Sequence, residues 1–103
     1  MYLIVFQFET PNEFVFPKHE QLESYVQERG WDFVYRDACI EVGWLRATHS
    51  EDELLEYFRP RLAVGERVTI FRFRSVPKLV PKFLDMEELL AWATEHSCLR
   101  TDS

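Results

Sequence analysis

Arg72 and Arg74 are the side chains whose type and spacing suggest chemistry most directly. They stand two residues apart in Val68–Lys82, a stretch with four Lys and Arg residues and no Asp or Glu. A guanidinium group donates paired hydrogen bonds to phosphate or carboxylate oxygens. Alternate residues of a strand share a face, so we expect both arginines on one side of the sheet, with Phe71 and Phe73 on the other. This stretch is therefore a candidate surface for an anionic partner.

The cations of residues 59–82 need an explanation, because the chain as a whole has a formal net charge of −6. Seven Lys and Arg residues lie there beside a single Glu. One interpretation is that Lys and Pro keep an exposed edge strand from pairing with other chains. Another is that the arginines contact nucleic-acid phosphates while an aromatic ring stacks on a base. The third is docking onto an acidic partner, or onto the protein's own helices in a dimer. The acidic total makes direct nucleic-acid binding the less favoured interpretation.

Residues 1–58 are strongly acidic, with twelve Asp and Glu residues against four Lys and Arg. Many of these carboxylates fall in two expected helices, where they are most simply solvated faces. The acidic run Glu51–Glu53 also suits the first turn of a helix, because negative charge is favourable at a helix N-terminus. Carboxylates displayed on adjacent helices can, in addition, imitate a phosphate backbone and occupy a basic nucleic-acid channel of another protein.

The sequence lacks the residue patterns that carry catalysis or bind a metal. Cys39 and Cys98 are the only cysteines, and they form neither a metal-ligand spacing nor a disulfide framework. The three glycines are scattered and make no phosphate-binding loop. The favoured interpretation is a protein with no catalysis of its own, no cofactor and no metal.

Aromatic residues make up 16% of the chain, and aromatic side chains dominate the energetics of interfaces. Trp31, Phe33 and Tyr35 are expected to share one face of their strand. With Trp44 and Trp92 they exceed what a small core needs. Either the last helix covers the second face of the sheet, with Trp92 inside, or an exposed aromatic patch marks a surface for a partner or for self-association.

The hydrophobic pattern predicts a short series of strands and helices. The run Tyr2–Phe6 is apolar at successive positions, which is typical of a central strand buried on both faces. Ser50 with Glu53, and Asp85 with Glu88, match the capping boxes that begin helices. The other expected elements are a helix over 18–29, a hairpin or one bent strand over 31–46, a strand over 66–75 and an extended segment over 76–82.

This order of elements predicts an α+β protein with a ferredoxin-like βαββαβ antiparallel sheet, its helices on one face, and an additional C-terminal helix. The first and third strands would then be central and the arginine-bearing fourth strand would lie at an edge. Residues 1–97 are expected to form a single α+β domain and residues 98–103 a flexible C-terminal tail. No apolar run approaches the roughly 20 residues of a membrane helix, and no basic region precedes the first run. We therefore expect a cytoplasmic protein that does not contact a membrane.

Together these patterns favour a small non-catalytic binding or inhibitor protein that docks onto another protein through an acidic helical surface and an aromatic patch. A partner with a basic nucleic-acid-binding surface is one interpretation of the acidic helices. Compactness, acidity and the lack of a catalytic motif also suit inhibitor proteins of phages and mobile elements, including anti-CRISPR proteins. Two alternatives remain: a ferredoxin-like nucleic-acid-binding protein or ribonuclease that uses the basic strand, and a structural homodimer subunit. The residues predicted to contact the partner are Glu20, Glu23, Asp52, Glu53, Glu56, Trp31, Trp44, Arg72 and Arg74.

Overall fold

Strands and helices are interspersed along the chain in the computed structural model, which describes residues 1–9, 20–78 and 80–102. The elements in chain order are β1 (Tyr2–Gln7), α1 (Glu20–Glu28), β2 (Asp32–Asp37), β3 (Ile40–Leu45), α2 (Glu51–Phe58), the 3-10 turn η1 (Arg59–Arg61), β4 (Arg67–Arg72), α3 (Met86–His96) and β5 (Leu99–Asp102). The predicted helix over 18–29 corresponds to α1, although its first two residues lie outside the described part of the chain.

The strands form one antiparallel sheet in the order β2-β3-β1-β4-β5. The predicted α+β class is therefore confirmed. Strand β1 lies in the middle, where Ile4 pairs with Gly43 of β3 on one side and with Ile70 of β4 on the other. Every residue of Tyr2–Phe6 is buried, as expected for a strand that is apolar on both faces.

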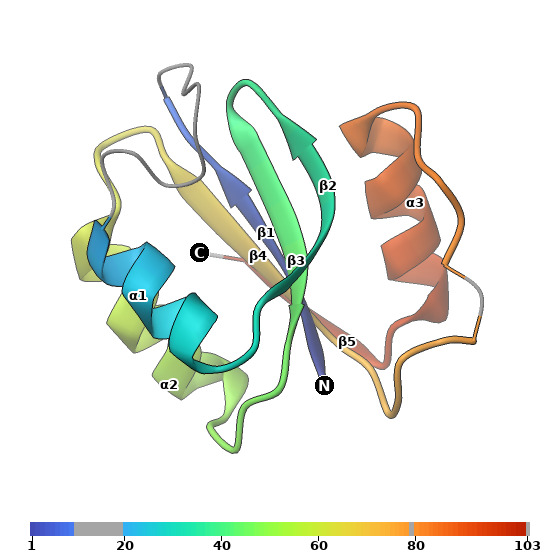
Figure 1. Cartoon of the computed structure of the whole chain (residues 1–103), viewed down its shortest axis with the longest axis horizontal. Coiled ribbons are helices and arrows are strands. Elements are labelled where there is room, and N and C mark those ends of the chain that lie inside the picture. Colours follow the sequence, from blue (N-terminus) through green and yellow to red (C-terminus); the bar gives the residue numbers. More distant parts are fainter. Residues whose placement is uncertain (10–19, 79, 103) are drawn as a thin grey trace.

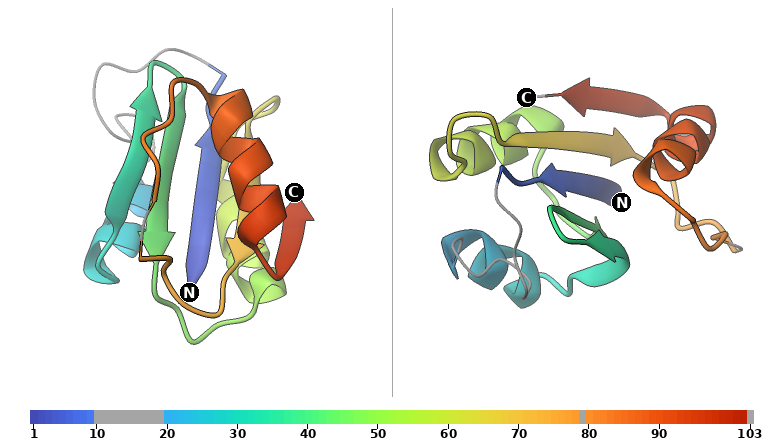
Figure 2. Two further views of the ribbon diagram at one scale, coloured as in Figure 1. Left: turned by 90° about the vertical axis from the view of Figure 1, so that its right-hand side faces the viewer. Right: turned by 90° about the horizontal axis from the view of Figure 1, so that it is seen from above.

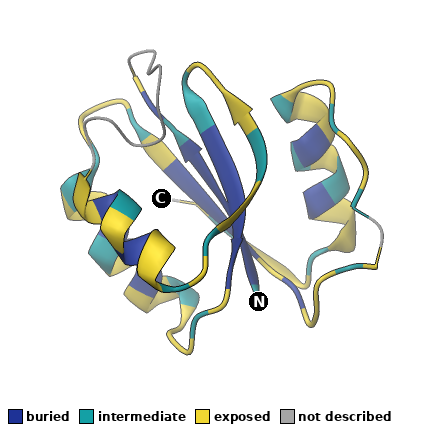
Figure 3. Cartoon of the chain, viewed as in Figure 1, coloured by how far each residue is buried: buried dark blue, intermediate teal, exposed yellow. Residues whose placement is uncertain are grey.

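Helices cover both faces of this sheet (Figure 1). Figure 2 shows α1 and α2 together on one face and α3 on the other. The helical surfaces that face the sheet carry the buried residues (Figure 3), among them Leu54 of α2 and Leu89 of α3. Residues of β1 alternate between the two cores: Ile4 packs with the core under α1 and α2, and Leu3 and Val5 with the core under α3. The last helix thus covers the second face, which was one of the two expected arrangements.

Both predicted capping boxes begin helices. The Ser50 hydroxyl accepts a hydrogen bond from the backbone N–H of Glu53 at 3.3 Å, at the start of α2. The Asp85 carboxylate accepts one from the N–H of Glu88 at 2.9 Å, at the start of α3. These bonds satisfy N–H groups that lack a partner within the helix.

Residues 31–46 form a hairpin, not one bent strand. Strands β2 and β3 pair antiparallel across a turn at Ala38 and Cys39, where Asp37 Oδ1 accepts a hydrogen bond from the N–H of Ala38 at 2.7 Å. The register shifts between Phe33 and Tyr35, and such a bulge adds one residue and alters which side chains share a face.

This bulge overturns one prediction about the aromatic residues. Trp31 packs against the core under α1 and α2, whereas Tyr35 packs against the core under α3. The expectation that Trp31, Phe33 and Tyr35 share one face is therefore wrong, because strict alternation along the strand does not survive an inserted residue.

Residues 99–102 form strand β5, where the sequence predicted part of a flexible tail; residue 103 lies outside the described chain. The N–H of Cys98 donates to the carbonyl of Arg72 at 2.7 Å, and the Thr69 hydroxyl donates to Asp102 at 2.9 Å. Because β5 pairs with β4, β4 is internal and the prediction that it is an edge strand is wrong. The backbone groups on its second side are satisfied by β5, so its arginines do not protect an exposed edge.

In the described part of the chain, none of the helices is long and apolar enough to cross a membrane.

Candidate functional site

Helices α1 and α2 gather negative charge on one side of the molecule. They lie next to each other on the same face of the sheet (Figure 1), and neither contains a Lys or Arg residue. Their carboxylates are Glu20, Glu23 and Glu28 in α1 and Glu51, Asp52, Glu53 and Glu56 in α2. We call the outer surface of these two helices the acidic helical face.

Two tyrosines join the helices. The rings of Tyr25 in α1 and Tyr57 in α2 stack with centroids 4.0 Å apart. The guanidinium of Arg29 lies 3.6 Å from the centroid of Tyr25, and that of Arg61 lies 3.8 Å from the centroid of Tyr57. Each arginine also donates to the backbone carbonyl of its tyrosine, at 2.9 and 2.8 Å. This arrangement arises because residues four apart are neighbours on a helical turn, and it holds both arginines against aromatic rings.

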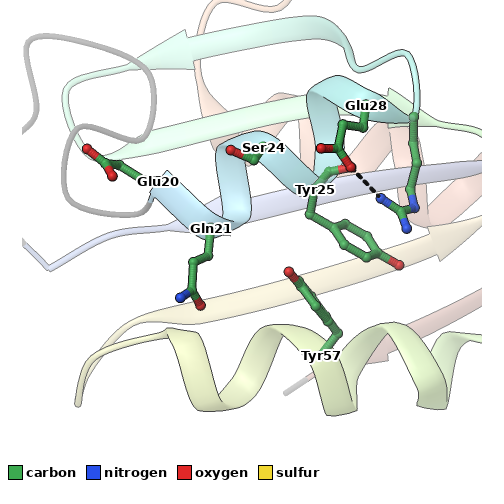
Figure 4. A pocket seen from close by; sticks show the side chains of 7 residues that line it. Glu20, Gln21, Ser24, Tyr25, Glu28 and Tyr57 are labelled. Atoms are coloured by element: carbon green, nitrogen blue, oxygen red, sulfur yellow. Dashed lines mark hydrogen bonds and ion pairs between the residues drawn. The ribbon is translucent and has the colours of Figure 1, made fainter.

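A hollow of about 490 Å³ lies along this junction. It is lined by Glu20, Gln21, Ser24, Tyr25, Glu28, Arg29 and Tyr57. Figure 4 shows Gln21 and Tyr25 extending from α1 toward α2, while Glu20, Ser24 and Glu28 lie on the other side of α1. Those three residues are spaced by four and therefore form one stripe along the helix. Their oxygens accept hydrogen bonds, so the stripe suits the ammonium or guanidinium groups of a partner.

The predicted acidic residues all belong to this face, but they are not equally available. Glu20, Asp52, Glu53 and Glu56 are exposed, and Glu23 is half-buried. Glu53 Oε2 lies 2.9 Å from His49 Nδ1. Hydrogen bonds from the side chain of His49 and from Ser50 hold the pKa of Glu53 below its ordinary value, so this carboxylate stays charged to lower pH.

The predicted aromatic contacts are not on this surface. Trp44 is only 6% exposed and packs edge-on against Phe73, with centroids 4.9 Å apart, in the core under α3. Trp31 is half-buried, and its ring lies on Gly43, where a Cβ atom would come within 2.5 Å of it. Helix α3 covers the face of the sheet to which Trp44 belongs, so the structure does not present Trp44 as an exposed contact for a partner.

The two predicted arginines have different environments. Arg72 Nε lies 3.3 Å from Glu51 Oε1, so this cation is paired with the first residue of α2. Arg74 lies beyond the end of β4 and lines a second hollow with Arg46. The structure therefore does not present Arg72 and Arg74 as an equivalent pair of free cations.

Glu41 has a structural role that the sequence analysis did not assign to it. Glu41 is only 2% exposed. Its carboxylate accepts hydrogen bonds from Arg36 at 2.6 and 3.1 Å and from Trp31 Nε1 at 3.0 Å. The hydrogen bond to Glu41 also raises the pKa of Arg36. The available signal was an acidic residue between Ile40 and Val42 in an apolar strand, because a buried carboxylate needs partners.

We expect Glu41→Gln to lower the free energy of unfolding by about 1–2 kcal/mol. The substitution replaces a charged acceptor with a buried neutral amide, which still faces the Arg36 guanidinium and the Trp31 N–H. The measurement is urea denaturation followed by circular dichroism. Glu56→Gln, on the exposed side of α2, is the control and is expected to change stability by less than about 0.5 kcal/mol. Equal effects of the two substitutions would contradict a structural role for Glu41.

Within residues 1–9, 20–78 and 80–102, no three His, Cys, Asp or Glu side chains come together in a way that could hold a metal ion. Cys39 and Cys98 are both free thiols. The chemistry that the described site offers is that of a charged binding surface.

Comparison of the chain with protein-family models, with curated proteins and with solved structures gave no match. The fold and the site define an α+β protein with an acidic pair of helices on one face, and its function is argued from that geometry.

Proposed function

We propose that the protein is a non-catalytic binding protein that docks through its acidic helical face onto a basic surface of another protein. The observation that carries the proposal is the set of carboxylates on two adjacent helices that contain no Lys or Arg residue. Glu51 does not count toward this set, because its side chain is largely buried beside Arg72. Opposite charge across an interface speeds association and selects the partner. A basic nucleic-acid-binding surface is the best complement, because helical carboxylates spaced along a face can take the place of phosphates.

The packing supports a preformed surface. The stack of Tyr25 and Tyr57, with Arg29 and Arg61 on its outer sides, ties α1 to α2 through aromatic and backbone contacts. A surface that is ordered before binding loses less conformational entropy when the complex forms. A protein that works in this way would inhibit its partner by occupying the partner's channel, as inhibitors of phages and mobile elements do, anti-CRISPR proteins among them.

We also propose a ferredoxin-like fold and a cytoplasmic location. The antiparallel order β2-β3-β1-β4, with α1 and α2 on one face, supports a ferredoxin-like unit that α3 and β5 extend. A cytoplasmic location agrees with the two free cysteines.

Direct nucleic-acid binding and homodimer formation remain the alternatives. The first would use Arg72, whose guanidinium is already close to Glu51. The second would use the face of the sheet on which α3 packs.

Reversing charge on the acidic helical face is expected to abolish docking. We would use three baits in extract of the native cells: the wild-type protein, a Glu20→Lys/Glu28→Lys variant, and a Glu87→Lys/Glu95→Lys variant on α3. Both variants change the net charge equally, but only the first alters α1. A protein that is captured by the wild type would be purified and titrated with the wild type and with both variants by calorimetry. We expect the α1 variant to bind it at least about tenfold more weakly, because like charges then face each other.

Equal weakening by both variants would show that only total charge matters and would contradict docking through α1 and α2. A parallel titration with labelled single-stranded RNA and duplex DNA tests the alternative. Tight, salt-sensitive binding that is lost in an Arg72→Ala/Arg74→Ala variant would replace the proposal with nucleic-acid recognition.

A further inference from the structure

A second hollow, of about 500 Å³, lies at one end of the sheet. Its lining residues are Met1, Arg46, Ala47, Arg74, Ser75 and Val76. Their convergence follows from the topology. Strands β3 and β4 both run antiparallel to β1, and Tyr2 pairs with Leu45 on one side and with Arg72 on the other. The segments that leave β3 and β4 therefore emerge on either side of the start of β1.

The backbone holds this end of the sheet together. The N–H of Phe73 donates to the carbonyl of Met1 at 2.8 Å, so the chain just before Arg74 stays beside the start of β1. On the other side, Arg46 and Ala47 directly follow β3, whose last residue Leu45 is fully buried. The hollow is thus bounded by segments that leave well-packed strands.

The charged side chains that line the hollow are all positive. No acidic residue lines it, and the exposed side chains of Arg46 and Arg74 make no ion pair or side-chain hydrogen bond within the described chain. Arg72, two residues earlier, has Glu51 within 3.3 Å. Two guanidinium groups around one hollow repel each other, and a bound anion relieves that repulsion. The Ser75 hydroxyl can supply a further donor.

We propose that this hollow binds a small organic oxyanion, a carboxylate or a phosphate ester, whose charged end is held by Arg46 and Arg74. The guanidinium fork matches the oxygen geometry of both groups. The apolar part of the ligand rests on Ala47 and Val76, and Val76 is 39% exposed. The volume lies within the range of small-molecule pockets, roughly 300–1,000 Å³. The net charge of −6 disfavours a polyanion here. This site is independent of the acidic helical face.

The test is a titration of the full chain followed by ¹H–¹⁵N NMR. Three probes carry the same ring: phenyl phosphate, benzoate and uncharged benzyl alcohol. We expect saturable shifts confined to residues 46–47 and 74–76 with at least one of the two anions and none with the alcohol. The anion that binds more tightly identifies the oxyanion, phosphate or carboxylate.

Matched variants make the test specific. Arg46→Gln and Arg74→Gln are each expected to weaken binding roughly tenfold, the effect of losing one charge-assisted hydrogen bond. Arg67→Gln, an exposed arginine at the opposite end of β4, should bind as the wild type does. Similar spectra away from the hollow would show that each variant is folded. Absence of saturable shifts with both anions, equal shifts with the alcohol, or an equal loss in the Arg67 variant would overturn the proposal.

Discussion

We expect Phe58→Ala to lower the free energy of unfolding by about 3–5 kcal/mol, as large truncations of fully buried aromatic side chains do. Phe58 ends α2 and is 0% exposed. Its ring meets Phe6 of β1 edge-on at 5.2 Å, and it contacts Tyr25 at 5.7 Å and Tyr57 at 6.0 Å between centroids. Removing it leaves a cavity where the sheet, α1 and α2 meet.

The measurement is urea denaturation followed by fluorescence and circular dichroism. Phe33→Ala is the matched control, because the ring of Phe33 is 55% exposed; we expect it to cost less than about 1 kcal/mol. Similar losses in the two variants would mean that α2 is not packed on β1 as described.

The same substitution bears on the proposed docking surface. Phe58 supports the stacked pair of Tyr25 and Tyr57 from the core side. A cavity beneath this pair would let α1 and α2 shift relative to each other. At a temperature where Phe58→Ala is still folded, its affinity for a docking partner is therefore expected to fall, whereas that of Phe33→Ala should not.

Features set by neighbouring residues were predictable from the sequence. The capping boxes at Ser50 and Asp85 need only a side chain and an N–H three residues later, so local spacing was sufficient. The central place of β1 followed from its unbroken apolar run. The sequence does not decide between a hairpin and one bent strand, because the turn contains neither Gly nor Asn. In the structure the Asp37 side chain accepts a hydrogen bond from the N–H of Ala38, as the side chain of a turn residue commonly does.

Features that depend on distant pairing were not predictable. Strand β5 is short and mostly polar, and only its place beside β4 makes it a strand. That pairing also removed the edge on which the interpretation of Arg72 and Arg74 rested. The bulge beside Phe33 had no sequence signal, and it broke the alternation used to place the aromatic residues.

The candidate site was predictable in part, because only some of its features depend on neighbouring residues. Sequence patterns placed the carboxylates on two helices, because helical periodicity and caps are local. They did not show that Tyr25 and Arg29, and Tyr57 and Arg61, repeat one spacing of four that joins the helices. That repeated spacing is the signal that could have revealed the junction. The burial of Trp44 could not be predicted in this way, because it depends on where α3 packs.

Leu89→Ala is the second substitution with a large expected effect, a loss of about 2–5 kcal/mol in the free energy of unfolding. Leu89 is 0% exposed and belongs to the core that α3 forms with Leu3, Val5 and Phe71. Urea denaturation measures the loss. Leu84→Ala is the control, because Leu84 lies just before α3 and is 88% exposed, and it should be nearly neutral.

The outcome also separates docking through α1 and α2 from the homodimer alternative. If α3 packs on the sheet, Leu89→Ala lowers the free energy of unfolding, and this decrease does not depend on protein concentration. If a second copy covers this face instead, truncation at Leu89 would disturb an interface, and the midpoint of unfolding would rise with concentration. A concentration-independent midpoint for both wild type and Leu89→Ala would favour the monomer, because the apolar face that could hold two copies together is then occupied by the chain's own helix.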